Sequence, residues 1–200
     1  MSRRISNMAL KVGVISDTHG DLDGWRRCMD TIFRDAELII HAGDLLYHGP
    51  KNPMVEGYGP PALAEAINAA PVPVVVARGN CDSAVDQLVI DTPIQAPYAF
   101  VQLDALRILA HHGDGLSDEE MARWAASWNL DVFIAGHTHI RELTRWDNTV
   151  FLNPGSPAIP KSDGSFEPVP TAATIQSDGV RIWDIAAGTV VCGPEPLPTQ

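Results

Sequence analysis

The chain has 200 residues, of which 45% are hydrophobic and 20% are charged, and this is typical of one globular domain with a sizeable core. Its formal net charge of −11 and its pI near 4.9 argue against a protein that grips nucleic acid through an extended basic face. An anionic substrate would need a local source of positive charge, and bound divalent cations can supply one.

The three cysteines are odd in number and widely spaced, so they predict neither a disulfide framework nor a CxxC metal site. A reducing cytoplasm fits this pattern. No segment is long and apolar enough to span a bilayer, and residues 1–8 are not followed by the apolar run of a signal peptide. We therefore expect a cytoplasmic protein that does not enter a membrane.

Short β-rich runs alternate with helical segments in the first part of the chain, and the C-terminal third is rich in strands. This order favours a mixed sheet or two stacked sheets flanked by helices. The predicted strands are Lys11–Ser16, Leu38–His41, Val72–Ala77, Phe100–Leu103, Arg107–Ala110, Val132–Ala135, Thr149–Leu152, Ala172–Gln176 and Val180–Ile185, and the predicted helices are Leu22–Arg34, Pro61–Ala69 and Asp118–Trp128.

We expect three segments along the chain: a mobile extension at 1–8, a single domain at 9–191, and a flexible, Pro-rich tail at 192–200. Inside the domain, the Gly- and Pro-rich stretch Leu45–Pro61 is long for a compact fold. Such loops are often functional, although a simple connector is the plainer alternative.

Polar side chains directly follow five of the apolar runs, at the strand ends where open α/β sheets usually place their sites. In an extended backbone, side chains at positions i and i+2 point the same way, so Asp17 and His19 can converge. Asp-x-His or Gly-Asp alone is a common turn sequence, whereas paired histidines at a strand end are typical of metal ligands. Five such motifs at one sheet edge predict a metal centre. The candidate ligands are Asp17, His19, Asp44, Asn80, His112, His137 and His139.

The ligand types narrow the choice of metal. Carboxylate, imidazole and carboxamide groups without a thiolate favour manganese, with iron, zinc, cobalt or nickel as alternatives, whereas four histidines disfavour Mg²⁺ or Ca²⁺. Seven side chains exceed the ordinary coordination number of one ion but suit two ions that share a carboxylate. We therefore expect two divalent metal ions per chain.

The order Asp17-x-His19, Gly43-Asp44, Gly79-Asn80, His112-Gly113 and Gly136-His137-x-His139 resembles the calcineurin-like metallophosphoesterases over residues 11–139. The resemblance is closer still to the YfcE-type bacterial phosphodiesterases. The additional motifs that carry it are Arg78-Gly-Asn-Cys-Asp-Ser-Ala-Val-Asp-Gln87, His48-Gly-Pro-Lys-Asn52, Glu56-Gly-Tyr58 and Asn153-Pro-Gly-Ser156. The resemblance implies an α/β (α+β) fold, a sandwich of two mixed β-sheets flanked by helices.

The resemblance also implies how the ligands divide. It places Asp17, His19 and His139 on the first metal and Asn80, His112 and His137 on the second, with Asp44 bridging both. A hydroxide shared by the ions would attack phosphorus, and Asn80 and His112 would be the catalytic side chains. The implied reaction is hydrolysis of a small phosphodiester.

This chain departs from the family pattern in two places. Cys81 stands where most members have a histidine that protonates the leaving group, and Asp114 stands where related chains have a second histidine. Whether His111 compensates is left open. Candidate substrate contacts are His48, Arg78 and Cys81; the alternatives are a surface histidine, a structural salt bridge and a space-filling residue.

Other functions remain open at this point. The same centre could serve a phosphomonoesterase or a cyclic-nucleotide phosphodiesterase. The fold is also used by a non-catalytic interaction module, a retromer subunit, but in this chain every ligand position is filled. A homo-oligomer is possible, whereas extended nucleic-acid binding is not expected.

Overall fold

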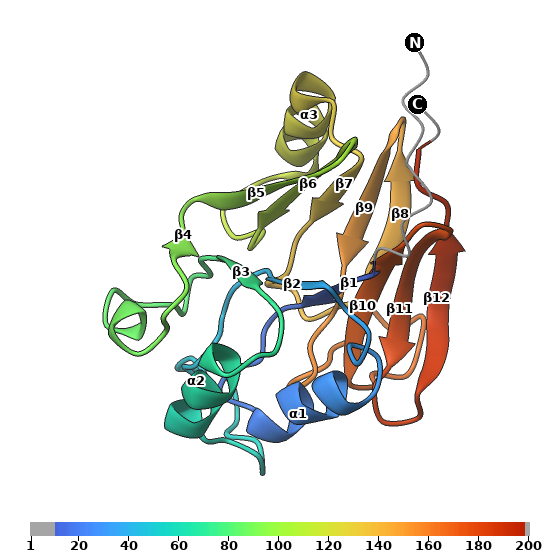
Figure 1. Cartoon of the computed structure of the whole chain (residues 1–200). Helices are drawn as coiled ribbons and strands as arrows, with labels where there is room; N and C mark the ends of the chain where they lie inside the picture. The colour runs from blue at the N-terminus through green and yellow to red at the C-terminus, as the bar shows by residue number, and fades with distance from the viewer. Residues whose placement is uncertain (1–10, 199–200) are drawn as a thin grey trace.

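The computed structural model describes residues 11–198, which form two mixed β-sheets that pack face to face (Figure 1). The predicted extension 1–8 lies outside the described residues. One sheet has seven strands in the order β12-β11-β10-β1-β2-β3-β4, with β1 (Lys11–Ile15), β2 (Leu38–His41), β3 (Val74–Ala77), β4 (Ile94–Gln95), β10 (Thr171–Gln176), β11 (Gly179–Asp184) and β12 (Thr189–Glu195). The other has five strands in the order β5-β6-β7-β9-β8, with β5 (Tyr98–Leu103), β6 (Leu106–His111), β7 (Val132–Ile134), β8 (Glu142–Trp146) and β9 (Thr149–Asn153). The predicted sandwich is confirmed.

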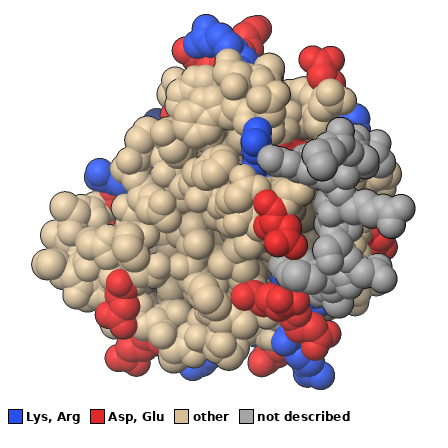
Figure 2. All heavy atoms as spheres, turned by 45° about the horizontal axis from the view of Figure 1, so that its top comes forward, with Lys and Arg blue, Asp and Glu red and all other residues tan. Residues whose placement is uncertain are grey.

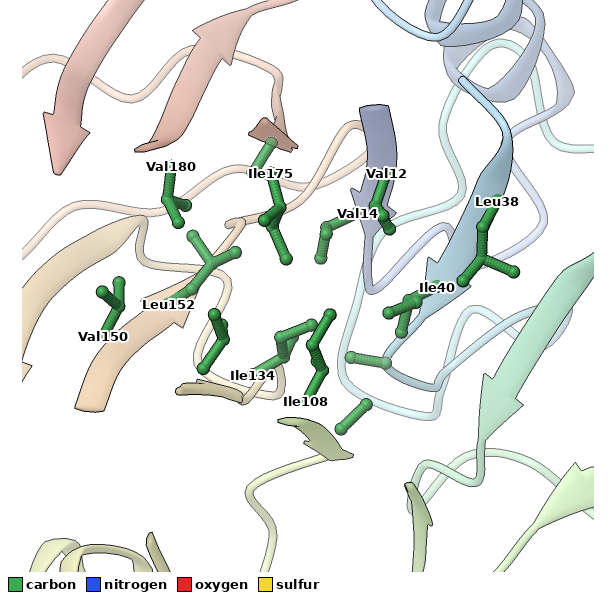
Figure 3. Packing of buried hydrophobic residues seen from close by; sticks show 14 of the residues in the cluster. Val12, Val14, Leu38, Ile40, Ile108, Ile134, Val150, Leu152, Ile175 and Val180 are labelled. Carbon is green, nitrogen blue, oxygen red and sulfur yellow. The ribbon is translucent and has the colours of Figure 1, made fainter. Parts of the chain in front are cut away.

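The core between the sheets consists of aliphatic side chains that point toward one another (Figure 3). Val12 and Val14 extend from β1 toward Ile108 on β6 and Ile134 on β7, and all four are fully buried. Their alternation places the intervening residues on the opposite face of the sheet. Burial of each such side chain stabilises the fold by about 1.5–3 kcal/mol.

In the described part of the chain, three α-helices cover the outer faces: α1 (Leu22–Asp30), α2 (Pro60–Asn68) and α3 (Asp118–Trp128). Helices α1 and α2 lie on one side of the sandwich and α3 on the other (Figure 1). A 3-10 turn, η1, spans Asp86–Leu88. The first helix was predicted to reach Arg34, but it ends at Asp30. The turn that follows packs the ring of Phe33 against Gly13, and a Cβ on Gly13 would lie 2.7 Å from that ring.

Strands β4, β8 and β12 were not predicted. The predicted flexible tail began at Cys192, and this boundary is wrong, because residues 192–195 belong to β12. Cys192 pairs with Ile182 and Glu195 with Val180, with a register shift between these pairs. Pro194 lies in this strand, which is at the edge of the sheet. Proline has no N–H to donate to a neighbouring strand, so within a sheet it is tolerated at an edge, where no partner needs that donor.

Candidate metal centre

The loops after β1, β2, β3, β6 and β7 bring all seven predicted ligands into one cluster. Strands β1, β2 and β3 run parallel in one sheet, and β6 and β7 run parallel in the other, so each set presents its carboxyl ends together. The cluster contains Asp17, His19, Asp44, Asn80, His112, His137 and His139.

The first half of the cluster is buried. Asp17 Oδ1 lies 3.3 Å from His139 Nε2 and 3.7 Å from His19 Nε2, and the two imidazole nitrogens are 3.1 Å apart. All three side chains are at most 3% exposed. Three ligand atoms that converge in this way can hold one cation.

The second half opens to solvent. Asn80 Oδ1 lies 2.8 Å from His137 Nδ1 and 3.1 Å from His112 Nε2. His112 is fully buried, whereas Asn80 and His137 are exposed. A substrate can therefore reach this half of the cluster without a rearrangement of the sandwich.

Asp44 lies between the two halves. Its Oδ2 is 3.7 Å from His19 Nε2 and 3.3 Å from His112 Nε2, so one carboxylate oxygen faces a histidine of each half. Its other oxygen, Oδ1, accepts a hydrogen bond of 2.7 Å from the backbone N–H of Cys81. This position suits a carboxylate shared by two ions.

Backbone carbonyls orient three of the four histidines. The Nδ1 atoms of His19, His112 and His139 lie 2.8, 2.9 and 2.8 Å from the carbonyl oxygens of Tyr47, Ala42 and Ile159. A carbonyl can only accept, so each Nδ1 carries the proton. Whenever such a ring is neutral, its Nε2 lone pair faces the carboxylates, the arrangement that metal-ligating histidines usually adopt.

The donor atoms fit divalent cations. Asp17 Oδ1 is a buried carboxylate oxygen without a hydrogen-bond partner; within residues 11–198, only Ser16 Oγ shares this state. A buried acceptor without a donor is costly, and its neighbours here are imidazole nitrogens that also offer lone pairs. A cation between them would satisfy all of these groups.

The backbone at the site is strained. Asp17, His19, Asp44, His137 and His139 all have positive φ, between 45° and 72°. The extended backbone assumed for Asp17 and His19 is therefore wrong, because the chain turns sharply at the end of β1. Left-handed conformations of non-glycine residues cost of order 1–3 kcal/mol each and are concentrated at functional sites.

Glycine allows the loops to approach closely. Gly43 has a φ of 103°, and a Cβ there would lie 2.6 Å from the backbone nitrogen of Gly79 and 2.8 Å from Nδ1 of His112. No side chain fits between these atoms. The glycine before Asp44 is therefore required for the contact between the loops after β2 and β3.

Asp82 supports the centre, although the sequence reasoning gave it no role. Its carboxylate accepts hydrogen bonds from the backbone N–H groups of Asp44, Leu45 and Gly79 at 2.9, 2.7 and 2.7 Å. Burial raises the pKa of Asp82 to about 6, against the lowering effect of these bonds. Its place in the Asn80-Cys-Asp82 block was the available signal.

His41 is a buried residue of β2, and it also links two ligand loops. Its Nδ1 accepts from the backbone N–H of Gly43 at 3.1 Å, so its Nε2 donates to Thr18 Oγ1 at 3.0 Å. Thr18 in turn donates to the carbonyl of Leu45 at 2.8 Å. Burial lowers the pKa of His41 to about 3, and the ring is neutral.

Charges within the cluster shift the pKa values of His112 and Asp44 in opposite directions. Burial lowers the pKa of His112, but the hydrogen bond to Asp44 and the charges of Asp17 and Asp44 outweigh it, and the pKa rises to about 9. Burial raises the pKa of Asp44, yet His112 lowers it to about 2. Carboxylates and a protonated His112 therefore coexist at neutral pH.

The long Leu45–Pro61 stretch folds back on the centre. A Cβ at Gly49 would lie 3.2 Å from Cys81 Sγ, which places the neighbouring His48 at the edge of the cluster. His48 Nδ1 lies 3.2 Å from the hydroxyl of Tyr58. Among the described residues, His48 has hydrogen-bond or ring partners in Tyr58 and Tyr47, and neither is a predicted ligand.

Two further residues have structural partners. Arg78 is exposed and donates from Nε to the carbonyl of Asp82 at 3.0 Å; no ion pair of Arg78 occurs within the described part of the chain. His111 packs edge-on against Trp124, and its Nδ1 accepts from the N–H of Gly113 at 2.8 Å. His111 thus shapes the turn after His112 and is not among the convergent ligands.

On the face shown in Figure 2, Lys and Arg side chains are scattered and form no extended basic surface. A cavity of about 830 Å³ between α3 and the loop after β8 shares no residue with the cluster. Among residues 11–198, no helix has the length and apolar character needed to cross a bilayer.

Known proteins resemble the chain in sequence and structure. It is 37% identical to phosphodiesterase YfcE of Escherichia coli over 153 residues, covering 76% of this chain and 82% of that protein. It is 31% identical to a probable metallophosphoesterase of Methanothermobacter thermautotrophicus, covering 90% and 95%. The solved structure of the Escherichia coli YfcE phosphoesterase superposes with a TM-score of 0.78 at 29% identity, covering 92% and 97%.

A family-level match covers most of the chain. Residues 10–178 match the calcineurin-like phosphoesterase superfamily domain. The predicted order of strand-end motifs, the two-sheet sandwich and the YfcE relatives agree with this match. The chain therefore belongs to the calcineurin-like phosphoesterase superfamily.

Proposed function

We propose that this protein is a phosphodiesterase that hydrolyses small phosphodiesters at two divalent cations held by the seven clustered side chains. The observation that carries the proposal is the buried Asp17 Oδ1, which has no hydrogen-bond partner and faces the Nε2 atoms of His19 and His139. Family membership and the YfcE relatives support the same reaction class.

The ligand halves would have different roles. Asp17, His19 and His139 would hold one ion in the buried half, while Asn80, His112 and His137 would hold the other in the open half. Asp44 would neutralise charge on both. The bound ions would lower the pKa of water to about 7 and offset charge on the phosphoryl oxygens. We propose manganese first because imidazole, carboxylate and carboxamide ligands suit it.

The side chains themselves would orient the substrate. Asn80 directs Oδ1 toward His112 and His137, while its Nδ2 lies 3.4 Å from Cys81 Sγ on the other side. That Nδ2 can donate to a phosphoryl oxygen in the open half. His48 and Arg78 remain candidate substrate contacts at the edge, since Gly49, the residue after His48, approaches Cys81 Sγ.

A non-catalytic interaction module is the second candidate. The fold is shared with vacuolar protein sorting 29 from Cryptosporidium parvum, at a TM-score of 0.65 and 18% identity, a similarity that supports the fold alone. The complete ligand set favours catalysis in this chain. We also propose a cytoplasmic location, since all three cysteines are free thiols.

The decisive experiment uses protein stripped with a chelator and then resupplied with one metal at a time. Bis(p-nitrophenyl) phosphate and p-nitrophenyl phosphate are compared by kcat/KM. The diester should be the better substrate, because it carries one negative charge and its activated leaving group needs little protonation. Comparable or higher kcat/KM on the monoester would reject the diesterase, and metal-independent rates would reject the metal centre.

A further inference from the structure

We infer that the cavity beside His137 binds one ester substituent of the phosphodiester and that it selects a substituent carrying an ammonium group, as in an amino alcohol. This inference rests on the proposed function. The cavity has a volume of about 310 Å³. Small-molecule sites usually begin near ~300 Å³, so this cavity suits one substituent rather than a whole nucleotide.

The cavity adjoins the open half of the metal cluster. Its wall includes Gly113, which follows His112, and Gly136, His137 and Thr138. The backbone N–H of Gly136 donates to the carbonyl of His112 at 2.7 Å, so the two ligand loops are joined at this wall. A phosphodiester whose phosphorus lies at the cluster can therefore extend one substituent into the cavity.

The inner surface of the cavity is apolar. Leu116, Met121, Ala135 and Phe151 line it, and the last three are buried, with 3–6% of their surfaces exposed. Asn153 also lines it, but its Nδ2 already donates to the carbonyl of Gly136 and to Thr138 Oγ1 at 3.0 Å each. The inner surface thus offers contact to alkyl groups rather than new hydrogen bonds.

The charged residues of the cavity are both acidic. Asp118, at the start of α3, and Glu142, at the start of β8, line it, and no lysine or arginine does. Within the described residues, neither carboxylate has an ion pair. Burial, together with the charges of Asp118 and Asp163, raises the pKa of Glu142. An anionic substituent is therefore repelled, and an ammonium group complements the site.

Two substrates of the same shape test this selectivity. The trimethylammonium group of p-nitrophenyl phosphocholine is replaced by an uncharged tert-butyl group in 3,3-dimethylbutyl p-nitrophenyl phosphate. We expect kcat/KM of the manganese-loaded enzyme to be about tenfold higher for the cationic ester, equivalent to about 1.4 kcal/mol. The preference should shrink as ionic strength rises.

Variants locate the effect. In Glu142→Gln, and further in the double variant with Asp118→Asn, the ratio of the two kcat/KM values should fall toward unity. Glu65→Gln changes an exposed carboxylate on α2 and is the matched control, with rates and ratio as in the wild type. Because the readout is a ratio measured on one enzyme sample, partial loss of folded protein cancels.

The outcomes separate the inference from the proposed function. Equal kcat/KM values for the two esters, or a preference that persists in the double variant, would overturn the assignment of the cavity. If the wild type failed to hydrolyse these esters and also bis(p-nitrophenyl) phosphate, the proposed phosphodiesterase would be wrong, and the inference would fall with it. Metal-dependent hydrolysis without the preference overturns the inference alone.

Discussion

The carboxylate of Asp82 holds the backbone of Asp44 in place through a hydrogen bond of 2.9 Å from the Asp44 N–H. The same carboxylate also accepts from the N–H of Gly79, so one side chain fixes the loops after β2 and β3 relative to each other. Asp82, two residues after Asn80, therefore positions Asp44, the proposed bridging ligand.

Asp82→Asn should lower both stability and metal affinity. The NH₂ group of asparagine cannot accept a hydrogen bond, so at least one buried backbone N–H would lose its acceptor. This loss should lower the free energy of unfolding by about 1–3 kcal/mol. Denaturant unfolding of metal-free protein and calorimetric titration with Mn²⁺ measure the two effects. Asp86→Asn is the control, because Asp86 also accepts a backbone hydrogen bond, from Ser83, but this bond is exposed and lies at the 3-10 turn. Its metal affinity should equal that of the wild type. Wild-type values for Asp82→Asn would contradict the positioning role.

Asp44→Ala should abolish binding of both ions and turnover. Asp44 Oδ2 is the carboxylate oxygen that faces His19 in one half and His112 in the other, so its loss leaves both halves without the shared charge. Metal content per chain is measured by mass spectrometry after dialysis, together with the rate on the activated diester. Two retained ions and a near-normal rate would show that another group bridges.

Metal binding should release a proton from His112. Its pKa of about 9 lies above the ordinary value of 6.5, so the protonated ring stabilises the metal-free fold fully below pH 6.5, and this contribution is lost as pH rises through about 9. A cation needs the Nε2 lone pair, so apparent affinity should rise with pH, by up to about tenfold per unit below pH 9.

Calorimetric titration with Mn²⁺ between pH 6.5 and 8.5, in buffers with different ionisation enthalpies, counts the released protons. About one proton per chain should come from His112 near neutral pH. Buffer-independent heats and a pH-independent affinity would show that His112 is already neutral before the metal binds.

Cys81→His should raise kcat for diesters with poor leaving groups and change activated diesters little. Burial, followed by the charge of Asp44, raises the pKa of the Cys81 thiol to about 12, so it is a poor acid, whereas a positioned general acid typically contributes ~10²–10⁴-fold. Cys81→Ser should leave the rate on activated diesters near the wild-type value, because the thiol is not the nucleophile.

Rates of both variants across a leaving-group series distinguish these roles. A Cβ at Gly49 would lie 3.2 Å from Cys81 Sγ, so a larger side chain at position 81 that keeps this direction crowds the loop that contains His48. A uniform fall in all rates for Cys81→His would therefore indicate crowding and reject the proton-donor argument. Complete loss in Cys81→Ser would mean that sulfur takes part in the chemistry.

The sequence by itself determined most of the strands, the three helices and the candidate ligands, whereas the choice of a two-sheet sandwich came from the family resemblance. Apolar runs such as Leu38–His41 are long enough for buried strands, and a polar residue after each run must lie at the sheet edge where the strand ends. Because the side-chain types also restrict the metal, a cluster of Asp17, Asp44 and several histidines was predictable without coordinates.

The tertiary structure decided what local pattern does not encode. The left-handed backbone at Asp17 and His19 depends on contacts with the loop after β2, where His19 N–H donates to the carbonyl of Asp44 at 3.0 Å. The role of Asp82 depends on loops 38 residues apart in the chain. Strand β12 contains Gly and Pro, and only pairing with β11 makes it a strand. These features arise from long-range packing, which a periodic pattern of neighbouring residues cannot report.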